Sequence, residues 1–291
     1  MKTITAILAT VLLGLSTAAC TIKADGNDVF SFNNKRVKAS KNYVTKNFNV
    51  GNFNQINMAG SGDVYFTQRP GAPAVSVVTS DNIADLRDVY VENNTLYIKF
   101  KKGYSITNTD KLDFTIQAEN LNDISLAGSG DIKLMNGLTT DKLKLSIAGS
   151  GDINCDNIQC SGDVKISLAG SGDVDSHNLQ CDDLDLSLAG SGDIKIAGIQ
   201  AKKVSASIAG SGDFKLQGNT KTAKYSIAGS GDIDADELLA EDVTASTSGS
   251  GEITCYASQS FKASKFGSGS IGYKGNPAEV DISKKGVYPI K

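Results

Sequence analysis

The stretch LKLSIAGSGDI, at residues 143–153, decides the fold because it joins a strand pattern to a tight turn. Apolar Leu143, Leu145 and Ile147 alternate with polar or small residues, and a period of two is typical of a β-strand. Gly-Ser-Gly then ends the strand, since glycine allows positive φ and lets neighbouring backbones approach closely. The apolar pattern resumes at Ile153, so the sequence predicts a strand, a turn and a second strand.

The AGSGD turn recurs along the chain at a nearly constant spacing. Full copies begin at residues 59, 127, 148, 169, 189, 209 and 228, and weaker copies begin at 248 and 266. From Gly128 onward, successive first glycines are 18 to 21 residues apart. A constant period of this length is typical of units that stack on one another as a solenoid. The sequence therefore predicts an all-β fold, a right-handed parallel β-helix (β-solenoid) with about 20 residues per coil and a turn at each AGSGD.

The spacing of the turns also predicts how the chain is divided. Residues 127–275 hold the regular GSGD repeat. Residues 43–126 are expected to form irregular coils, because the 68 residues from Gly60 to Gly128 leave room for about three degenerate coils. Within this part, residues 89–100 are predicted to form a hairpin that turns at two consecutive asparagines.

The last residues are expected to close the solenoid. Residues 276–291 are predicted to cap the final coil, since an open sheet edge needs protection from other chains. The apolar side chains expected to do this are Val280, Ile282, Val287 and Ile290.

The first residues have the features of an export signal. Lys2 precedes a short apolar run and a group of small residues, so residues 1–19 are predicted to be a cleaved signal peptide. Cys20 follows, and the arrangement resembles bacterial lipoprotein signals, although Thr17 stands where those signals usually have leucine. We expect lipidation at Cys20, a lipid-anchored linker over residues 20–42, and an outer-membrane location at the cell surface or on the periplasmic face. Ordinary cleavage that leaves Cys20 as a thiol is the alternative, and it also exports the protein.

Composition argues against several classes of function. The formal charge of −3, from 29 basic and 32 acidic residues, gives no field that favours nucleic acid. Tryptophan is absent and histidine occurs once, so the chain is poor in the usual catalytic and sugar-stacking side chains. No cofactor is expected.

The aspartates of the repeat should lie above one another, where their charges repel unless something compensates. One interpretation is structural: each side chain accepts hydrogen bonds from backbone N–H groups of its own turn or of the next turn. The alternative is a ladder of calcium sites. The period and turns differ from those of calcium-binding nonapeptide repeats, which favours the structural interpretation. The residues concerned are Asp131, Asp152, Asp173, Asp193, Asp213 and Asp232, followed by Glu252.

A column of serines is expected to face outward beside the alanines of the repeat. Together they would make a strip of small side chains with charged neighbours. The strip is either a surface of regular hydroxyl ladders or a recognition surface for another chain or ligand. Its candidate recognition residues are Ser146, Ser167, Ser187, Ser207 and Ser226, and the column also includes Ser125, Ser246 and Ser264.

Two cysteines are predicted to lie at equivalent positions of adjacent coils. A disulfide between Cys160 and Cys181 would suit an oxidising compartment, but an in-register parallel pair is an awkward site for one. Two small buried thiols are the alternative. Cys155 and Cys255 are expected in one inward column five coils apart, too distant to bond.

Three features together resemble the head GIN domain family of auto-transporter-type adhesins. These are the run NFNQINMAGSGD at Asn52–Asp63, the predicted hairpin at Val89–Phe100 and the GSGD array. The resemblance covers residues 43–275 and implies a β-helix shaped like those of pectin lyases but without their chemistry, in a lipoprotein that can form homo-oligomers.

The function that this resemblance implies is a non-enzymatic envelope adhesin or scaffold that binds a surface protein or a glycan through its repeated face. A polysaccharide lyase or hydrolase is one alternative, but such enzymes need a unique acid cluster, and here the acids repeat in every coil. His177 and Asp175 are expected to be a surface pair. An envelope accessory or sensor protein is the other alternative, since fold alone does not fix function.

Overall fold

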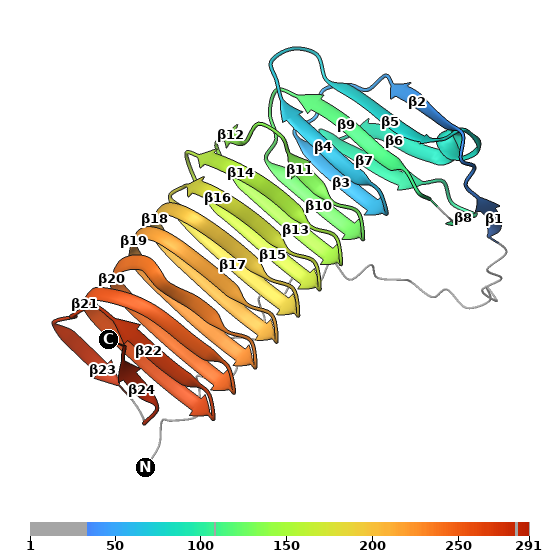
Figure 1. Cartoon of the computed structure of the whole chain (residues 1–291). Coiled ribbons are helices and arrows are strands. Elements are labelled where there is room, and N and C mark those ends of the chain that lie inside the picture. The colour runs from blue at the N-terminus through green and yellow to red at the C-terminus, as the bar shows by residue number, and fades with distance from the viewer. Residues whose placement is uncertain (1–33, 108, 283–284, 291) are drawn as a thin grey trace, which may run out of the picture. The chain divides into compact units, whose positions relative to one another are not determined.

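The computed structural model describes residues 34–107, 109–282 and 285–290. The predicted signal peptide, Cys20 and most of the predicted linker therefore lie outside the described residues. The described part is all-β and forms a β-helix of about eight turns, which confirms the predicted fold class (Figure 1). Its only helix is a 3-10 helix of six residues, η1 (Asp81–Leu86). No helix among these residues is long and apolar enough to cross a membrane.

Each regular coil begins and ends at an AGSGD turn. From β18 onward one strand of 16 or 17 residues runs from one turn to the next, and the second bend is present as an irregularity of register within the strand, as between Ile196 and Ile199. The strands of the array are β10 (Asp123–Gly128), β11 (Ile132–Leu134), β12 (Leu138–Thr140), β13 (Leu143–Gly149), β14 (Ile153–Cys160), β15 (Val164–Gly170), β16 (Val174–Gln180), β17 (Asp183–Gly190), β18 (Ile194–Gly210), β19 (Phe214–Gly229), β20 (Ile233–Gly249), β21 (Glu252–Gly267) and β22 (Ser270–Lys274).

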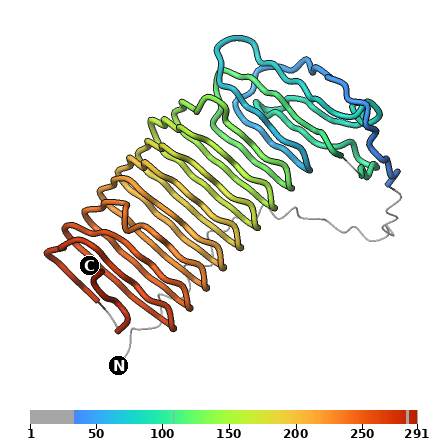
Figure 2. Tube along the Cα trace, viewed as in Figure 1, coloured from blue at the N-terminus to red at the C-terminus, as the bar shows by residue number. Residues whose placement is uncertain are grey.

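Neighbouring coils pair in parallel and place equivalent repeat positions side by side. Ser146 pairs with Ser167, Ser167 with Ser187, and Ser187 with Ser207. Because the side-chain period of a strand is two, this register keeps the apolar columns inside and this serine column outside. The Cα trace in Figure 2 shows the resulting succession of similar coils from green to red.

The core is a continuous stack of aliphatic side chains whose sizes compensate between coils. One inward column runs through Leu186, Ala206, Tyr225 and Ala245, paired coil by coil. Tyr225 is fully buried between the two alanines, so the large ring occupies space that the small neighbours leave. This alternation lets the coils keep one spacing although the sequence of the column varies.

The N-terminal part differs from the prediction of three degenerate coils between Gly60 and Gly128. Strand β3 (Gln55–Gly60) pairs directly with β10, and Gly60 lies opposite Gly128. Strand β4 (Asp63–Gln68) likewise pairs with β11. The residues between β4 and β10 form strands on the opposite side of β3 and β4, and the chain then returns to pair β10 with β3. This return places one glycine turn directly on another, and two such turns pack together more closely than a glycine turn and an irregular coil.

The segment between β4 and β10 packs on the coil that β3 and β4 form. Strand β7 (Thr95–Phe100) pairs with β3, and β9 (Leu112–Ala118) pairs with β4, both in parallel. Strand β6 (Arg87–Glu92) forms the predicted antiparallel hairpin with β7, and its turn residues Asn93 and Asn94 have φ of 49° and 61°. The remaining strands here are β5 (Ala74–Ser80), antiparallel to β9 and to β2 (Tyr43–Phe48), and the pair β1 (Lys35–Lys38) and β8 (Tyr104–Thr107).

The C-terminal strands pair with the last coil of the array, where the cap was predicted. Strand β23 (Glu279–Ile282) pairs with β21, and β24 (Val287–Pro289) pairs with β22. Val280 and Ile282 stack on the buried Phe261 and Ala263, yet they remain 46% and 39% exposed because no further coil of the described chain packs on them.

Candidate functional site

The AGSGD turns stack so closely that two of their positions admit only glycine. Gly170 has φ of +139°, and a Cβ there would lie 2.0 Å from the carbonyl oxygen of Gly149. A Cβ on Gly172 would lie equally close to the carbonyl oxygen of Gly151. The backbone N–H of Ser171 donates to the Gly149 carbonyl oxygen at 2.9 Å, so the turns also bond to each other. The glycines are therefore needed by the backbone.

The aspartates that follow these turns form a ladder of hydrogen bonds, which we call the Asp ladder. In each step the backbone N–H of one coil donates to a carboxylate oxygen of the preceding coil, at 2.7 to 3.2 Å. These bonds match the structural interpretation of the column. The ladder runs through Asp63, Asp131, Asp152, Asp173, Asp193, Asp213, Asp232 and Glu252.

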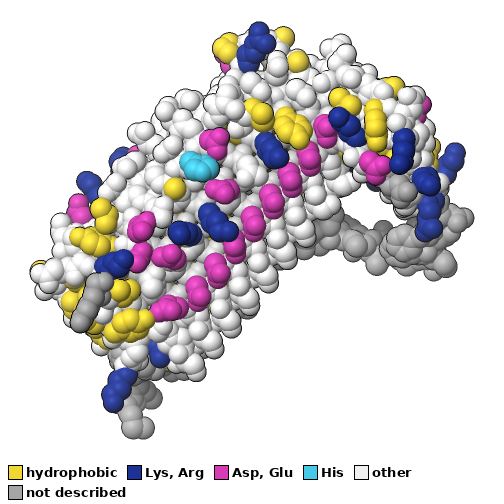
Figure 3. All heavy atoms as spheres, viewed as in Figure 1, with side chains coloured by type: hydrophobic (Ala, Val, Ile, Leu, Met, Phe, Trp, Pro, Cys, Tyr) yellow, Lys and Arg dark blue, Asp and Glu magenta, His cyan; other side chains and the backbone are white. Residues whose placement is uncertain are grey.

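The Asp ladder is visible as a row of acidic side chains along the coils (Figure 3). Its last member, Glu252, accepts a hydrogen bond from the Tyr288 hydroxyl at 2.6 Å. Lys195 lies 3.2 Å from the second oxygen of Asp193 and offsets part of the charge. Among the residues that the structure describes, no group of three or more histidine, cysteine or acidic side chains is arranged to hold a metal. Calcium binding by the ladder stays a hypothesis.

The serine column faces outward, as predicted, beside the more exposed alanine column. The Ser187 hydroxyl donates to the Ser167 hydroxyl at 3.1 Å. Other hydroxyls reach backbone carbonyls of the preceding coil, as Ser207 does at Leu186 and Ser246 at Tyr225. We call the two columns together the Ser/Ala strip: Ser125, Ala127, Ser146, Ala148, Ser167, Ala169, Ser187, Ala189, Ser207, Ala209, Ser226 and Ala228. Some of the serine hydroxyls of the strip therefore form hydrogen bonds between coils, and the alanine methyl groups make its more exposed part.

The four described cysteines are buried free thiols. Cys160 and Cys181 follow the paired residues Gln159 and Gln180, so they occupy equivalent positions of adjacent coils as predicted. Burial raises the pKa of Cys181 to about 12, which keeps the thiol protonated and slow to exchange. A disulfide between the two stays a hypothesis. Cys155 and Cys255 lie in one inward column, five coils apart.

The single histidine pairs with a residue other than the one expected. His177 Nδ1 lies 3.1 Å from Asp156 Oδ1, in the preceding coil, and both side chains are exposed. Asp175 lies on the same strand as His177, but the coil-to-coil register brings Asp156 closer. The two side chains form a surface pair.

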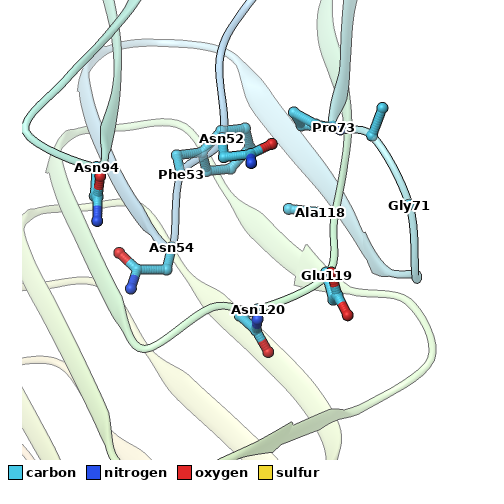
Figure 4. Close-up of a pocket in the computed structure, with 10 residues that line it drawn as sticks. Asn52, Phe53, Asn54, Gly71, Pro73, Asn94, Ala118, Glu119 and Asn120 are labelled. Atoms are coloured by element: carbon cyan, nitrogen blue, oxygen red, sulfur yellow. The ribbon is translucent and has the colours of Figure 1, made fainter.

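A polar pocket of about 480 Å³ lies where connections between the N-terminal strands converge (Figure 4). Strands β7, β3 and β10 are parallel neighbours, so the residues that precede them lie on one side. The backbone N–H of Asn54 donates to the Asn94 carbonyl oxygen at 3.0 Å, and that of Asn122 donates to the Asn54 carbonyl oxygen at 2.8 Å. These bonds fix three of the connections against each other and shape the pocket.

Sequence reasoning missed this pocket and one member of the Asp ladder. Asp63 belongs to the ladder although 68 residues separate it from Asp131. The pocket is built from segments 52–54, 71–73 and 118–120 and from Asn94. The only signal in the sequence was the repeated placement of asparagine just ahead of predicted strands.

Comparison with protein families gives a match over most of the chain. The family model described as "Putative auto-transporter adhesin, head GIN domain" matches residues 52–174 and 163–277. No curated protein matches the sequence.

Several solved protein structures are similar in fold. A "putative lipid binding protein" from Parabacteroides distasonis is 27% identical with a TM-score of 0.66, over 88% of this chain and 100% of its own. A "putative adhesin" from Parabacteroides merdae is 25% identical with a TM-score of 0.66, over 88% of this chain and 99% of its own. A "putative adhesin" from Parabacteroides distasonis is 25% identical with a TM-score of 0.64, over 88% and 99%.

Proposed function

Because the chain belongs to the head GIN domain family of auto-transporter adhesins, we propose that it is a non-enzymatic envelope adhesin that binds its partner through the Ser/Ala strip. The observation that supports the strip is its register. Equivalent residues of β10, β13, β15, β17, β18 and β19 pair side by side, so the same small side chains recur in every coil. A partner with a repeating surface could contact several coils at once, which raises avidity without strong single contacts.

The neighbouring outward column gives the strip a polar border. Lys144, Lys165, Asp185 and Lys224 occupy the position two residues before the serine in their strands. Small side chains in the middle and charged side chains at the rim match the usual anatomy of a protein interface, in which charge is depleted at the centre. The partner is a surface protein or a glycan, and the same strip could join two copies of this chain.

The N-terminal sequence supports the location that an adhesin requires. We propose that the chain is exported, that Cys20 carries the lipid anchor and that the β-helix is held at the outer membrane. This part of the proposal rests on the order of basic, apolar and small residues before Cys20.

Charge placed on the strip tests the proposal. Bacteria expressing the full chain with Ser167→Lys and Ser187→Lys are compared with wild type for adhesion to mucin-coated and fibronectin-coated surfaces. The matched control is Gln159→Lys with Gln180→Lys, which adds the same charge at exposed, paired positions outside the strip. We expect the serine variant to lose adhesion and the glutamine variant to keep it. Equal adhesion of both variants would contradict a binding role for the strip.

The enzyme and sensor alternatives have less support. The acidic side chains of the AGSGD turns repeat uniformly in the Asp ladder, whereas a glycoside-cleaving site needs a unique pair of carboxylates. No specific observation favours a sensor.

A further inference from the structure

We propose that the pocket at the N-terminal connections binds a neutral saccharide. The pocket lies outside the Ser/Ala strip, so this inference holds whether or not the strip binds a partner. Its volume of about 480 Å³ is within the range of ligand sites in proteins. It is also formed by loops held on a rigid scaffold, where binding residues commonly lie.

The side chains around the pocket are amides with hydrogen-bonding capacity. Asn52, Asn94 and Asn120 line the pocket, and their amide side chains are exposed (Figure 4). Each amide offers one acceptor and two donor hydrogens, and each sugar hydroxyl is both donor and acceptor. A set of amides can therefore match a ring of hydroxyls whichever way each hydroxyl turns.

Asn54 supplies the strongest single reason for a ligand. Its Oδ1 is shielded from solvent and has no hydrogen-bond partner among the described residues. A buried polar atom without a partner is costly, so native proteins nearly always satisfy it. Asn54 lines the pocket, so a small rotation of its amide would turn this oxygen toward a hydroxyl group of a ligand there.

The charges of the lining favour a neutral ligand. Glu119 is the only ionisable side chain of the pocket lining, and it can accept hydrogen bonds from sugar hydroxyls. No lysine or arginine lines the pocket, so a carboxylate, sulfate or phosphate would meet repulsion without compensation. Sialylated, sulfated and uronic oligosaccharides should therefore bind worse than neutral ones.

Ala72 and Pro73 supply the apolar surface that the C–H face of a sugar ring can contact. Phe53 is buried beneath the connections, and Pro73 and Ala118 lie nearby in the lining (Figure 4). Apolar contact combined with a few convergent polar groups is the usual composition of a small-molecule site.

The test uses the purified full chain on a printed array of defined oligosaccharides. The array carries neutral glycans ending in galactose, glucose, mannose or N-acetylglucosamine, and sialylated, sulfated and uronic glycans. We expect binding to members of the neutral group. Titration calorimetry with the brightest neutral oligosaccharide then gives the affinity of each variant.

The expected loss on Asn54→Ala is about tenfold in affinity, since one hydrogen bond to a buried acceptor is removed. Asn120→Ala and Glu119→Gln change exposed side chains, so they test the pocket even if Asn54→Ala does not fold; each should weaken binding about threefold or more. The matched control is Asn154→Ala, an exposed asparagine of the array, which should bind like wild type. The proposal is overturned by an array without binding, by binding to acidic glycans only, or by pocket variants that bind as tightly as the control.

Discussion

At the level of single residues, the core contains a buried polar atom without a hydrogen-bond partner among the described residues. The Tyr225 hydroxyl is fully buried, and it has no hydrogen-bond partner among the described residues. Burial raises the pKa of Tyr225 well above its usual value, so the hydroxyl stays protonated. The ring is useful because it fills the space beside Ala206 and Ala245, whereas the hydroxyl only adds the cost of removing it from water.

Tyr225→Phe should therefore stabilise the protein. We expect the free energy of unfolding to rise by about 1–3 kcal/mol, because the ring remains and the unsatisfied hydroxyl is gone. Tyr225→Ala is the opposite control and should cost about 3–5 kcal/mol, since it leaves a cavity beside two alanines. Urea unfolding followed by circular dichroism measures both changes. A loss of stability in the phenylalanine variant would show that the hydroxyl is satisfied.

At the level of the single element, the AGSGD turn holds neighbouring coils together in two ways. The backbones of stacked turns approach each other closely, and the Asp ladder links them by hydrogen bonds. The ladder explains why an acid follows each turn: its oxygen accepts a backbone N–H that would otherwise lack a partner at the corner of the coil. Both features need coils in register, and they act on every pair of adjacent turns.

Gly172→Ala tests the close approach without the complication of positive φ. The added Cβ would lie 2.0 Å from the Gly151 carbonyl oxygen, so neighbouring coils must separate. We expect a loss of about 3 kcal/mol or more. Gly51→Ala is the matched control, because nothing lies within 4 Å of its added Cβ, and its stability should change by about 0.5 kcal/mol or less. Similar melting temperatures for the two variants would contradict close stacking at the turn.

The strands and turns of the array could be predicted because their signals are local. The period of two fixes which side chains face inward, and glycine marks each corner, as in the strand from Leu143 to Gly149. The outward direction of Ser167 and the backbone bonds of Asp173 follow from the same pattern. The partner of His177 did not follow, since it depends on the register between coils.

At the scale of the whole molecule, the order of the coils is less predictable from the sequence. The pairing of Gly60 with Gly128 means that the chain between them returns to its starting point, and no local pattern indicates this return. The same return assembles the pocket, because it brings Asn54, Asn94 and Asn120 together from separate connections. The exposure of Val280 and Ile282 likewise depends on packing between coils at the end of the array, which is not a local property of their strand.

The adhesin that we propose must lie outside the cell, and protease treatment of intact bacteria reports where the β-helix lies. Cells expressing the full chain are treated with proteinase K and probed with an antibody against the array, with a soluble periplasmic protein as the control for intact membranes. We expect the array signal to disappear while the control protein survives. An array signal that persists until the outer membrane is permeabilised, and is then lost together with the control protein, would place the chain in the periplasm and rule out an adhesin at the cell surface.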